Sequence, residues 1–517
     1  MGVKNLWDIL ESCKKTVPLH HLQNKRVCVD LSCWMVQLHS VSKSHACVKE
    51  KVYLKGLFHR LRALIALNCS VVFVADGSIP AIKLSTYRRR LNVGKEVAQN
   101  ETNLQKATSL RRNMGSEFSC MIKEAKVLGM GLGIACLNGI EEAEAQCALL
   151  NFESLCDGCF SSDSDTFLFG ARTVYRDICL GDGGYVVCYE MTDIERKLGF
   201  GRDSLIALSL LLGSDYYQGV HGLGPESACQ IVKSIGDKYV LKKFASEGLE
   251  WVKKRKGGKN DLRQDDNILQ VINAYMKPKC HPADSDIVHK ALAQYPFQRT
   301  ELQQICAEFF QWPSEKTDGY ILPSIAERDL RRFANLRLTS SEVGLNLPLH
   351  EIPVKCPVSE VIKSRKVQGR ECYEVSWEGM DGLENSIVPA DLLESACREK
   401  ILVFEERKAQ RKKQNIHKRR PKKKESTSTL AELDLKLQNF NTDSNEAVSS
   451  VDKNEIIDLL SPSPPKKSNF SSKCQQSSDQ HIEVINLSDS ENDMSVEHKQ
   501  KVKELRLFLA SIRNDIH

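Results

Sequence analysis

The segment CDGCFSSDSDTFLFG, residues 156–170, carries the strongest indication of the fold. Its first residues are typical of a buried strand, which runs into a turn of small residues that holds Asp163 and Asp165. Two carboxylates this close repel each other, and the apolar residues 167–169 raise the cost of an unpaired charge. One acid should be protonated unless a cation holds both ionised. An Asx-type turn that caps a short helix is the alternative for an isolated pair.

Similar strands recur three times before this segment. They are RVCVDLS at 26–32, VVFVADG at 71–77 and GIACLNG at 133–139. Residues 51–67 have helical spacing with apolar side chains on one face, and a further helix begins at about Glu141. Strands that alternate with helices indicate a parallel sheet covered on both faces. We therefore expect an α/β fold with a mostly parallel sheet over the first 335 or so residues.

Acidic residues follow the carboxyl end of each predicted strand, and a helical segment adds one more. Ligands of open α/β sheets bind beyond these strand ends. So many carboxylates in one place require cations, and Mg²⁺ takes oxygen ligands and tolerates carboxylates reached through water. Two such ions about 4 Å apart can activate a water and stabilise the leaving oxygen of a phosphodiester. The acidic residues are Asp30, Asp76, Glu142, Glu144, Asp163, Asp165 and Asp215.

The composition indicates a soluble intracellular protein of 517 residues, with room for more than one domain. Its 19 cysteines are scattered, and the pair Cys156–Cys159 has no second pair to complete a zinc site. We expect Cys159 to pack in its strand and the thiols to be in a reducing compartment. The amino terminus lacks the pattern of a secretory signal, and no apolar run approaches the roughly 18 residues of a membrane span.

Charge is segregated along the chain, whose formal net charge is +6. Residues 407–424 carry 11 Lys and Arg and no acid, whereas residues 425–517 have a net charge of −6. The first 406 residues therefore have a net charge of only +1. A nucleic-acid surface in the folded part must come from local patches of basic residues.

The remainder of the chain changes character twice. It is helical from about residue 203 to about 337, around a Gly-rich connection in GVHGLGPESA at 219–228. A smaller β-rich unit follows at 352–406, where ECYEVSWEGM has the alternation of a strand. Residues 407–517 are poor in aromatics and rich in Ser, Asp, Asn and Lys, so we expect them to be largely disordered.

Seven segments together resemble the XPG/flap-endonuclease superfamily of structure-specific DNA nucleases and occur in the family's order. The details are most similar to its Holliday-junction resolvase branch, which includes plant single-strand DNA endonucleases. The resemblance implies a PIN-like nuclease core in two regions, 1–95 and 119–202, with an arch or linker at 96–118 and a helical DNA-binding region at 203–340. The segments are MGVKNLWDIL, CVDLS, VFVADG, EEAEAQCALL, SSDSDTFLFG, LLGSDYYQGVHGLGPESA and ILPSIAERDLRRFANLRL.

The resemblance also assigns roles to residues of the expected active site. It implies that the seven acids named above hold two Mg²⁺ ions, with Mn²⁺ as a substitute. By motif spacing, Lys83 and Arg90 match a catalytic basic pair that steadies the scissile phosphate and stabilises charge in the transition state. An ordinary solvated helix face is the alternative for these two residues.

The Gly-rich connection resembles a helix–two-turn–helix hairpin that grips the duplex backbone. Gly219, Gly222 and Gly224 would let backbone groups approach phosphates or a bridging K⁺. The family often has a basic residue where this chain has Pro225 and Glu226, which puts a side-chain phosphate contact in doubt. A basic loop at 251–259 could supply that contact through Lys253, Lys254 and Arg255.

Two further segments resemble known modules. Residues 352–406 are similar to a chromodomain, but Trp377 alone remains at an aromatic-cage position, where Cys356 and Met380 occupy the others. We therefore expect a module that positions DNA or has a structural role, rather than one that binds methyl-lysine by cation–π attraction. QQICAEFF at 303–310 comes near a sliding-clamp box, but we expect it to be helix core.

The tail contains three short motifs. KRRPKKK at 418–424 fits a nuclear localisation signal, with DNA binding as the alternative. Two short apolar stretches followed by serines resemble SUMO-interacting motifs, which add a strand to the edge of the partner's sheet. Their apolar residues are Ile456, Ile457 and Leu459 in the first copy and Val484, Ile485 and Leu487 in the second.

The sequence thus predicts a nuclear, Mg²⁺-dependent endonuclease that cuts Holliday junctions with paired nicks, and also 5′ flaps, in DNA repair and recombination. We expect a monomer in solution that dimerises on junctions, and partners that include branched DNA and SUMO or SUMO-modified proteins. A replicative-type flap endonuclease is one alternative. A catalytically silent scaffold that binds branched DNA and chromatin is another.

Overall fold

This computed structural model describes residues 2–41, 51–84, 86, 116–181, 183–249, 251–252, 267–342 and 355–418, all within one unit, Met1–Ser461. No helix in these ranges is long and apolar enough to cross a membrane. Several predictions fall outside the described residues. They concern Arg90, most of the arch, the basic residues Lys253, Lys254 and Arg255, and the tail motifs beyond residue 418.

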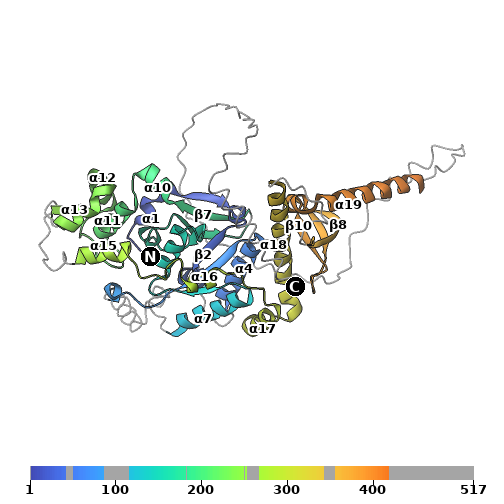
Figure 1. Ribbon diagram of the computed structural model, residues 1–517, viewed down its shortest axis with the longest axis horizontal. Helices are drawn as coiled ribbons and strands as arrows, with labels where there is room; N and C mark the ends of the chain where they lie inside the picture. Colours follow the sequence, from blue (N-terminus) through green and yellow to red (C-terminus); the bar gives the residue numbers. More distant parts are fainter. Residues whose placement is uncertain are drawn as a thin grey trace, which may run out of the picture. The chain divides into compact units, whose positions relative to one another are not determined.

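A seven-stranded sheet organises the first 200 residues, with strand order β1-β7-β6-β5-β2-β3-β4 (Figure 1). The neighbouring pairs from β6 to β4 are parallel, so the expectation of a mostly parallel sheet is confirmed. Both pairs that contain β7 are antiparallel. For β6 and β7 the reason is the short connection at 180–184, which returns the chain directly beside β6. The strands are β1 (Lys15–Pro18), β2 (Arg26–Asp30), β3 (Ser70–Ala75), β4 (Cys136–Asn138), β5 (Gly158–Phe160), β6 (Thr173–Cys179) and β7 (Tyr185–Glu190).

Alternate residues of the central strand β2 enter two different hydrophobic cores. Val27 and Val29 pack in one core, whereas Cys28 packs in the other. This is the period of two expected for a strand with helices on both faces. The first core contains residues of α2 (Leu31–Val41), α4 (Val52–Ala66) and α7 (Ser116–Gly131). The second contains residues of α1 (Leu6–Ile9), α8 (Ala143–Phe152), α9 (Asp165–Leu168), α10 (Met191–Leu198) and α11 (Arg202–Leu212).

The predicted elements are present, with shifted ends. The helix expected at 51–67 is α4, and Cys159 is fully buried in β5 as expected. The strand expected at 156–165 is shorter, because a turn begins at Ser161, where the hydroxyl accepts a hydrogen bond from the Asp163 N–H at 3.1 Å. α7 begins at Ser116, so residues 116–118 belong to this helix and not to the predicted arch.

Helices dominate the region from 202 to 342, as predicted. In α17, Leu302, Cys306 and Phe310 are buried, which confirms the interpretation of 303–310 as helix core. The helices after α11 are α12 (Pro225–Ile235), α13 (Asp237–Glu247), α15 (Ile268–Met276), α16 (Asp286–Leu292), α17 (Arg299–Phe310) and α18 (Ser314–Glu342). Short 3₁₀ turns lie at η1 (Glu11–Cys13), η2 (Leu19–Leu22) and η3 (Ala81–Lys83).

The β-rich unit is a three-stranded antiparallel meander that packs against two helices. The strands are β8 (Val358–Val367), β9 (Arg370–Trp377) and β10 (Asn385–Pro389), and α19 (Ala390–Lys418) follows. Residues of α18 and α19 share one core with the sheet. The prediction of disorder from residue 407 is wrong for 407–418, which are helical. Residues 407–418 contain no Gly or Pro that would end the helix, and overall composition does not reveal this.

Candidate active site

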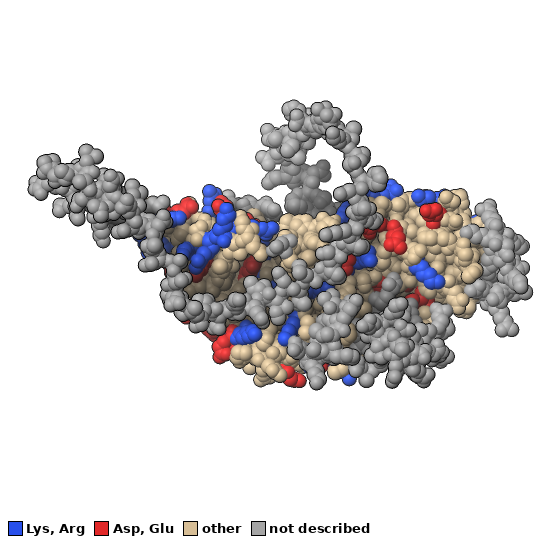
Figure 2. Space-filling model, turned by 180° about the vertical axis from the view of Figure 1, so that it is seen from behind, with Lys and Arg blue, Asp and Glu red and all other residues tan. Residues whose placement is uncertain are grey.

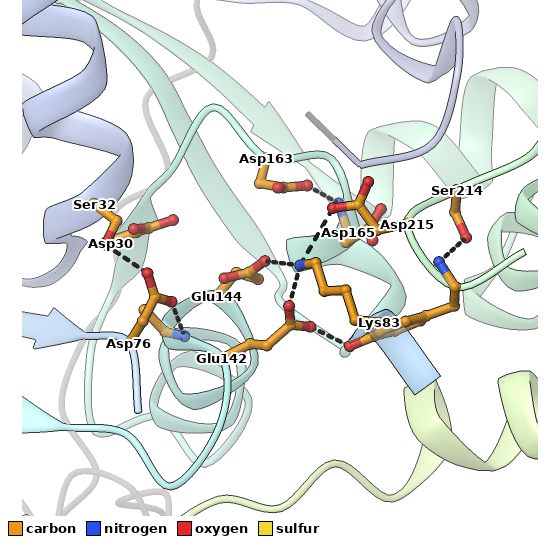
Figure 3. Close-up of polar contacts among 12 residues, drawn as sticks. Asp30, Ser32, Asp76, Lys83, Glu142, Glu144, Asp163, Asp165, Ser214 and Asp215 are labelled. Atoms are coloured by element: carbon orange, nitrogen blue, oxygen red, sulfur yellow. Dashed lines mark hydrogen bonds and ion pairs between the residues drawn. The ribbon is translucent and has the colours of Figure 1, made fainter. Parts of the chain in front are cut away.

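Seven carboxylates meet at one edge of the sheet, as the sequence predicts (Figure 3). The strands β2, β3 and β5 end nearly level, because Asp30 pairs with Val74 of β3 and Val29 pairs with Phe160 of β5. Each acid lies at the end of a strand or in the loop or first helical turn that follows it, except the last, which follows α11. Six of the seven are at most 8% exposed, and the seventh, Asp76, is exposed. The six are Asp30, Glu142, Glu144, Asp163, Asp165 and Asp215.

Two of these carboxylates are held at the starts of helices. Asp30 accepts hydrogen bonds from the Cys33 N–H at 2.9 Å and from the Ser161 hydroxyl at 3.0 Å. Asp76 accepts from the Ala143 N–H at 3.0 Å and from the Ser32 hydroxyl at 2.5 Å. The backbone N–H groups at the starts of α2 and α8 thus fix the positions of these two carboxylates.

The aspartate pair of the opening segment forms the turn and also presents free oxygens. The N–H of Asp165 donates to Oδ1 of Asp163 at 3.1 Å, which is the Asx-type turn considered as the alternative. Oδ2 of Asp163 and Oδ1 of Asp165 are nevertheless buried without a hydrogen-bond partner among the described residues. A buried carboxylate oxygen in this condition needs a cation or a proton.

Lys83 places its ammonium between three of the acids. It contacts Asp215 Oδ2 at 3.2 Å and Glu144 Oε1 at 3.9 Å, and it is paired with Glu142 Oε1 (Figure 3). Burial by itself would lower the pKa of Lys83, but the surrounding carboxylates, led by Glu144, raise that pKa well above its usual value. The side chain is therefore charged and holds together acids that would otherwise repel one another.

One lysine does not neutralise the group. Burial, followed by the charge of Glu142, raises the pKa of Glu144 well above its usual value. Burial, followed by the charges of Asp163 and Asp215, does the same to the pKa of Asp165. The site therefore demands more positive charge than the described part of the chain supplies.

The donors fit divalent cations that prefer oxygen. Two buried carboxylate oxygens lack partners, and every acid of the group offers oxygen alone, which suits Mg²⁺ better than a soft metal. No three carboxylate, His or Cys side chains of the described ranges are arranged as ligands of one metal ion. Because the ammonium of Lys83 lies between three of the acids, their side chains are arranged around this lysine and not around a metal ion.

Two tyrosine hydroxyls complete the site, and the sequence analysis did not find them. The Tyr216 hydroxyl donates to Oε2 of Glu142, and the Tyr275 hydroxyl donates to Oδ2 of Asp165 at 3.0 Å. Tyr216 follows Asp215 directly, so its position was a usable signal. Tyr275 lies 110 residues from Asp165 in the sequence and carries no local signal.

Gly2 is a further residue that sequence reasoning missed. Its φ is +82°, and an added Cβ would collide with the side chains of Asp163, Ser164 and Asp165. The next residue, Val3, donates its N–H to the Ser164 hydroxyl at 3.0 Å. The amino terminus thus packs against the aspartate turn, where a side chain has no room.

The Gly-rich connection lies between α11 and α12. Gly219 and Gly222 have φ of +84° and +72°, which favour glycine, and Gly224 caps the amino terminus of α12. An added Cβ would meet nothing within 4 Å at Gly222 or Gly224, so the backbone is approachable from outside there. At Gly219 an added Cβ would lie 2.6 Å from backbone atoms of Leu212 and Gly213, so the packing of the chain itself requires a glycine there. The open backbone at Gly222 and Gly224 is compatible with the DNA-backbone role predicted for them.

Trp377 of the β-rich unit is a core residue. It is 7% exposed, and its indole N–H donates to the Ser386 hydroxyl at 2.9 Å. Cys356 is likewise buried, at 7% exposed. These positions have structural contacts, in keeping with the expectation that the unit is not a methyl-lysine reader.

A cavity adjoins the carboxylates, and the described surface carries side chains of both charges. A cavity of about 510 Å³ lies beside the site, and Glu142 and Tyr216 line it together with residues of α15. On the face seen in Figure 2, basic and acidic side chains are interspersed over the described surface. This agrees with the small net charge of the first 406 residues.

Family models match three parts of the chain. The XPG N-terminal domain matches residues 1–97 and the XPG I-region matches residues 133–215. The chromo domain of single-strand DNA endonuclease 1 matches residues 356–410. Together they account for the carboxylate edge of the sheet and for the β-rich unit.

Curated proteins resemble the chain over its length. "Single-strand DNA endonuclease 1" of Arabidopsis thaliana is 55% identical, covering 100% of both chains. The protein of the same description from Oryza sativa subsp. japonica is 53% identical and covers 96% of this chain and 83% of its own. "Flap endonuclease GEN homolog 1" of Homo sapiens is 37% identical over 47% of this chain and 26% of its own.

Solved structures share the fold. Human GEN1 in complex with Holliday junction DNA has a TM-score of 0.61 and 25% identity, and it covers 80% of this chain and 100% of its own. The catalytic core of Rad2 in complex with DNA substrate has a TM-score of 0.50 and 30% identity, over 63% and 99% of the two chains. The fold is that of an XPG-type, structure-specific endonuclease, and the two XPG matches contain all seven carboxylates. Within that class, the chain belongs to the single-strand DNA endonuclease 1 family.

Proposed function

We propose that this chain is an Mg²⁺-dependent endodeoxyribonuclease that resolves Holliday junctions by paired nicks and also cuts 5′ flaps. The observation that carries the proposal is the gathering of seven carboxylates at one edge of the sheet, three of them around Lys83, with two buried oxygens that have no hydrogen-bond partner among the described residues. Divalent cations neutralise the carboxylates of such a site and in turn attract a phosphate group. The DNA-bound relatives described above support DNA as the substrate.

When bound, two Mg²⁺ ions, or Mn²⁺ in their place, supply Lewis-acid chemistry that activates water and stabilises the leaving oxygen, giving a 5′-phosphate and a 3′-hydroxyl. The seven acids hold the ions. Lys83 then gives up its ion pairs with the carboxylates and, together with Arg90, steadies the scissile phosphate. The hydroxyl of Tyr216 keeps Glu142 oriented.

DNA is held away from the cut by contacts that read shape and phosphates. Gly219, Gly222 and Gly224 approach the duplex backbone directly or through K⁺. The basic loop with Lys253, Lys254 and Arg255 adds side-chain contacts, and the chromodomain-like unit positions a further length of duplex.

Resolution of a junction needs two incisions, so two monomers assemble on one four-way junction. The basic segment 418–424 directs the chain to the nucleus. The two SUMO-interacting motifs recruit SUMO or SUMO-modified proteins, and a tail deletion that left SUMO binding unchanged would remove this part of the proposal.

The test uses the full chain with Mg²⁺ on an immobile four-way junction, a 5′ flap and a plain duplex, with Asp30→Ala as the control. We expect symmetrical paired nicks in the junction and incision of the flap, both absent in the variant. Flap cutting with an untouched junction would favour the replicative-type flap endonuclease. Tight binding without cutting would favour the silent scaffold.

A further inference from the structure

Tyr275 connects the helical extension to the aspartate turn. It lies in α15, it is fully buried, and its hydroxyl donates to Oδ2 of Asp165 at 3.0 Å. Its ring packs against Tyr216 at 4.8 Å and against Phe169 at 5.3 Å between centroids. The ring is thus held from two sides, and the hydroxyl has a defined position over one carboxylate oxygen.

Tyr275 also lies beside the loop that carries Asp215. Its ring packs against Tyr216, the residue that follows Asp215 in that loop. The hydroxyl of Ser214 accepts a hydrogen bond from the Tyr216 N–H at 3.2 Å. Tyr275 therefore lies between two of the acidic segments, the turn with Asp165 and the loop with Asp215.

The bond from Tyr275 distinguishes the two oxygens of Asp165. Oδ2 is engaged, whereas Oδ1 is buried without a hydrogen-bond partner among the described residues. The terminal torsion of an aspartate is broad, so the plane of an unrestrained carboxylate turns over a wide range of angles and its oxygens have no fixed direction. The Tyr275 hydroxyl selects one orientation and leaves Oδ1 available to a cation.

We infer that Tyr275 is a positioning residue of the metal site, which binds no metal itself but fixes the ligand oxygen of Asp165. This inference rests on the proposed function, because it takes the carboxylate group to be a metal site. It also implies that the site is incomplete without α15, the helix that carries Tyr275. Partners that orient metal ligands typically contribute about 10–100-fold to metal affinity or activity.

The test compares two isosteric variants of the full chain. Tyr275→Phe removes the hydroxyl and keeps the packed ring. The control is Tyr53→Phe, since Tyr53 is also buried, at 5% exposed, and donates to a carboxylate, Glu124 Oε2 at 2.6 Å, outside the seven acids. The first readout is the Mg²⁺ concentration that gives half of the metal-induced rise in melting temperature. The second is the Mg²⁺ dependence of junction cleavage.

We expect Tyr275→Phe to need about tenfold more Mg²⁺ in both measurements and to regain most of its cleavage rate at saturating Mg²⁺. Ser214→Ala should give a smaller shift in the same direction, and Tyr53→Phe none. A melting transition in EDTA verifies that each variant folds. If Tyr275→Phe does not fold, Ser214→Ala carries the comparison.

Two results would overturn the inference, and they differ. If the wild-type chain is stabilised by Mg²⁺ and cuts DNA while Tyr275→Phe binds Mg²⁺ as tightly as Tyr53→Phe, the role of Tyr275 is lost and the proposed function stands. If Mg²⁺ neither stabilises the wild-type chain nor supports cleavage, the proposed function fails and the inference fails with it.

Discussion

Two groups of charged side chains lie at different parts of the seven-stranded sheet and differ in their balance of charge. At the carboxyl ends of β2, β3 and β5, seven acids gather, and the ammonium of Lys83 contacts three of them. At the antiparallel side, Lys15 pairs with Glu190 at 2.7 Å and with Asp193 at 2.5 Å, and Arg196 pairs with Asp193 at 2.5 Å. The second group is neutral, whereas the first has a large excess of negative charge.

The direction of the pKa shifts follows this balance. The hydrogen bond from Lys15 lowers the pKa of Asp193, so that acid is stable in its ionised form. Burial raises the pKa of Glu144 and of Asp165, and neighbouring acids raise both further. The two groups differ in whether basic side chains balance the charge of the buried acids. That balance, and not the number of acids, distinguishes the candidate active site from a structural ion pair.

The largest expected effect is on cleavage when one acid of each group becomes an amide. Asp163→Asn should reduce the single-turnover rate on a four-way junction by about 100-fold or more, since loss of even a partner of a metal ligand costs about 10–100-fold. Asp193→Asn should leave the rate unchanged, because its partners are Lys15 and Arg196, neither of which pairs with an acid of the first group in the described ion pairs. Equal losses in the two variants would abolish the distinction between the groups.

The two lysines offer the next comparison, because each contacts more than one acid. Lys83→Met should lower the single-turnover rate by about 100-fold, the effect of removing one group that stabilises transition-state charge. Lys15→Met should not change it. Junction binding, measured with Ca²⁺ in place of Mg²⁺, should be retained in both. Weaker binding by Lys83→Met in proportion to its lost rate would make Lys83 a DNA contact without a role in the chemistry.

A pair of glycines with similar backbone conformations tests the packing of the amino terminus. Gly2→Ala should lower the cleavage rate by about tenfold, because its Cβ displaces the aspartate turn and small misplacements of reacting groups are costly. Gly199→Ala has the same left-handed strain at φ +73°, but its Cβ meets nothing within 4 Å. It should cost about 1–2 kcal/mol of stability and no activity. Equal activity in the two variants would show that the turn absorbs the added methyl group.

The smallest expected effect is on the pH dependence of stability in EDTA. The folded-state pKa of Glu144 is raised from 4.5, so its favourable contribution is present below that value and is lost as pH rises through the raised pKa. For Asp193 the folded-state pKa is lowered from 3.8, so its contribution is present above that value and is lost as pH falls through the lowered pKa.

Urea unfolding across pH measures both contributions. Glu144→Gln should flatten the decline in unfolding free energy above pH 4.5, and saturating Mg²⁺ should flatten it in the wild-type chain too. Asp193→Asn should remove stability that is lost on acidification. A wild-type chain whose stability rises with pH in EDTA over the range above 4.5 would contradict the assignment of Glu144 to an unbalanced group.

Local pattern was sufficient for most of the fold and for the acids. Alternation and strand ends placed Asp30, Asp76 and the aspartate pair at one edge, because parallel strands direct their carboxyl ends the same way. Composition was a poorer guide beyond residue 406, where α19 continues to Lys418. The strand expected at 156–165 is present as the shorter β5, and its end was misplaced because it depends on side-chain hydrogen bonds in the turn that follows.

The sequence by itself determined the α/β class, the order of the acidic motifs and the family resemblance, since these depend on residues close together in the chain. Tertiary structure alone decided which groups complete the site. Gly2 packs against the aspartate turn from 161 or more residues away in the chain, and Tyr275 reaches Asp165 across 110 residues. No local spacing encodes such contacts, because they arise when separate helices pack on the same edge of the sheet. The sequence therefore identifies the acids, and tertiary packing determines which groups contact each of them.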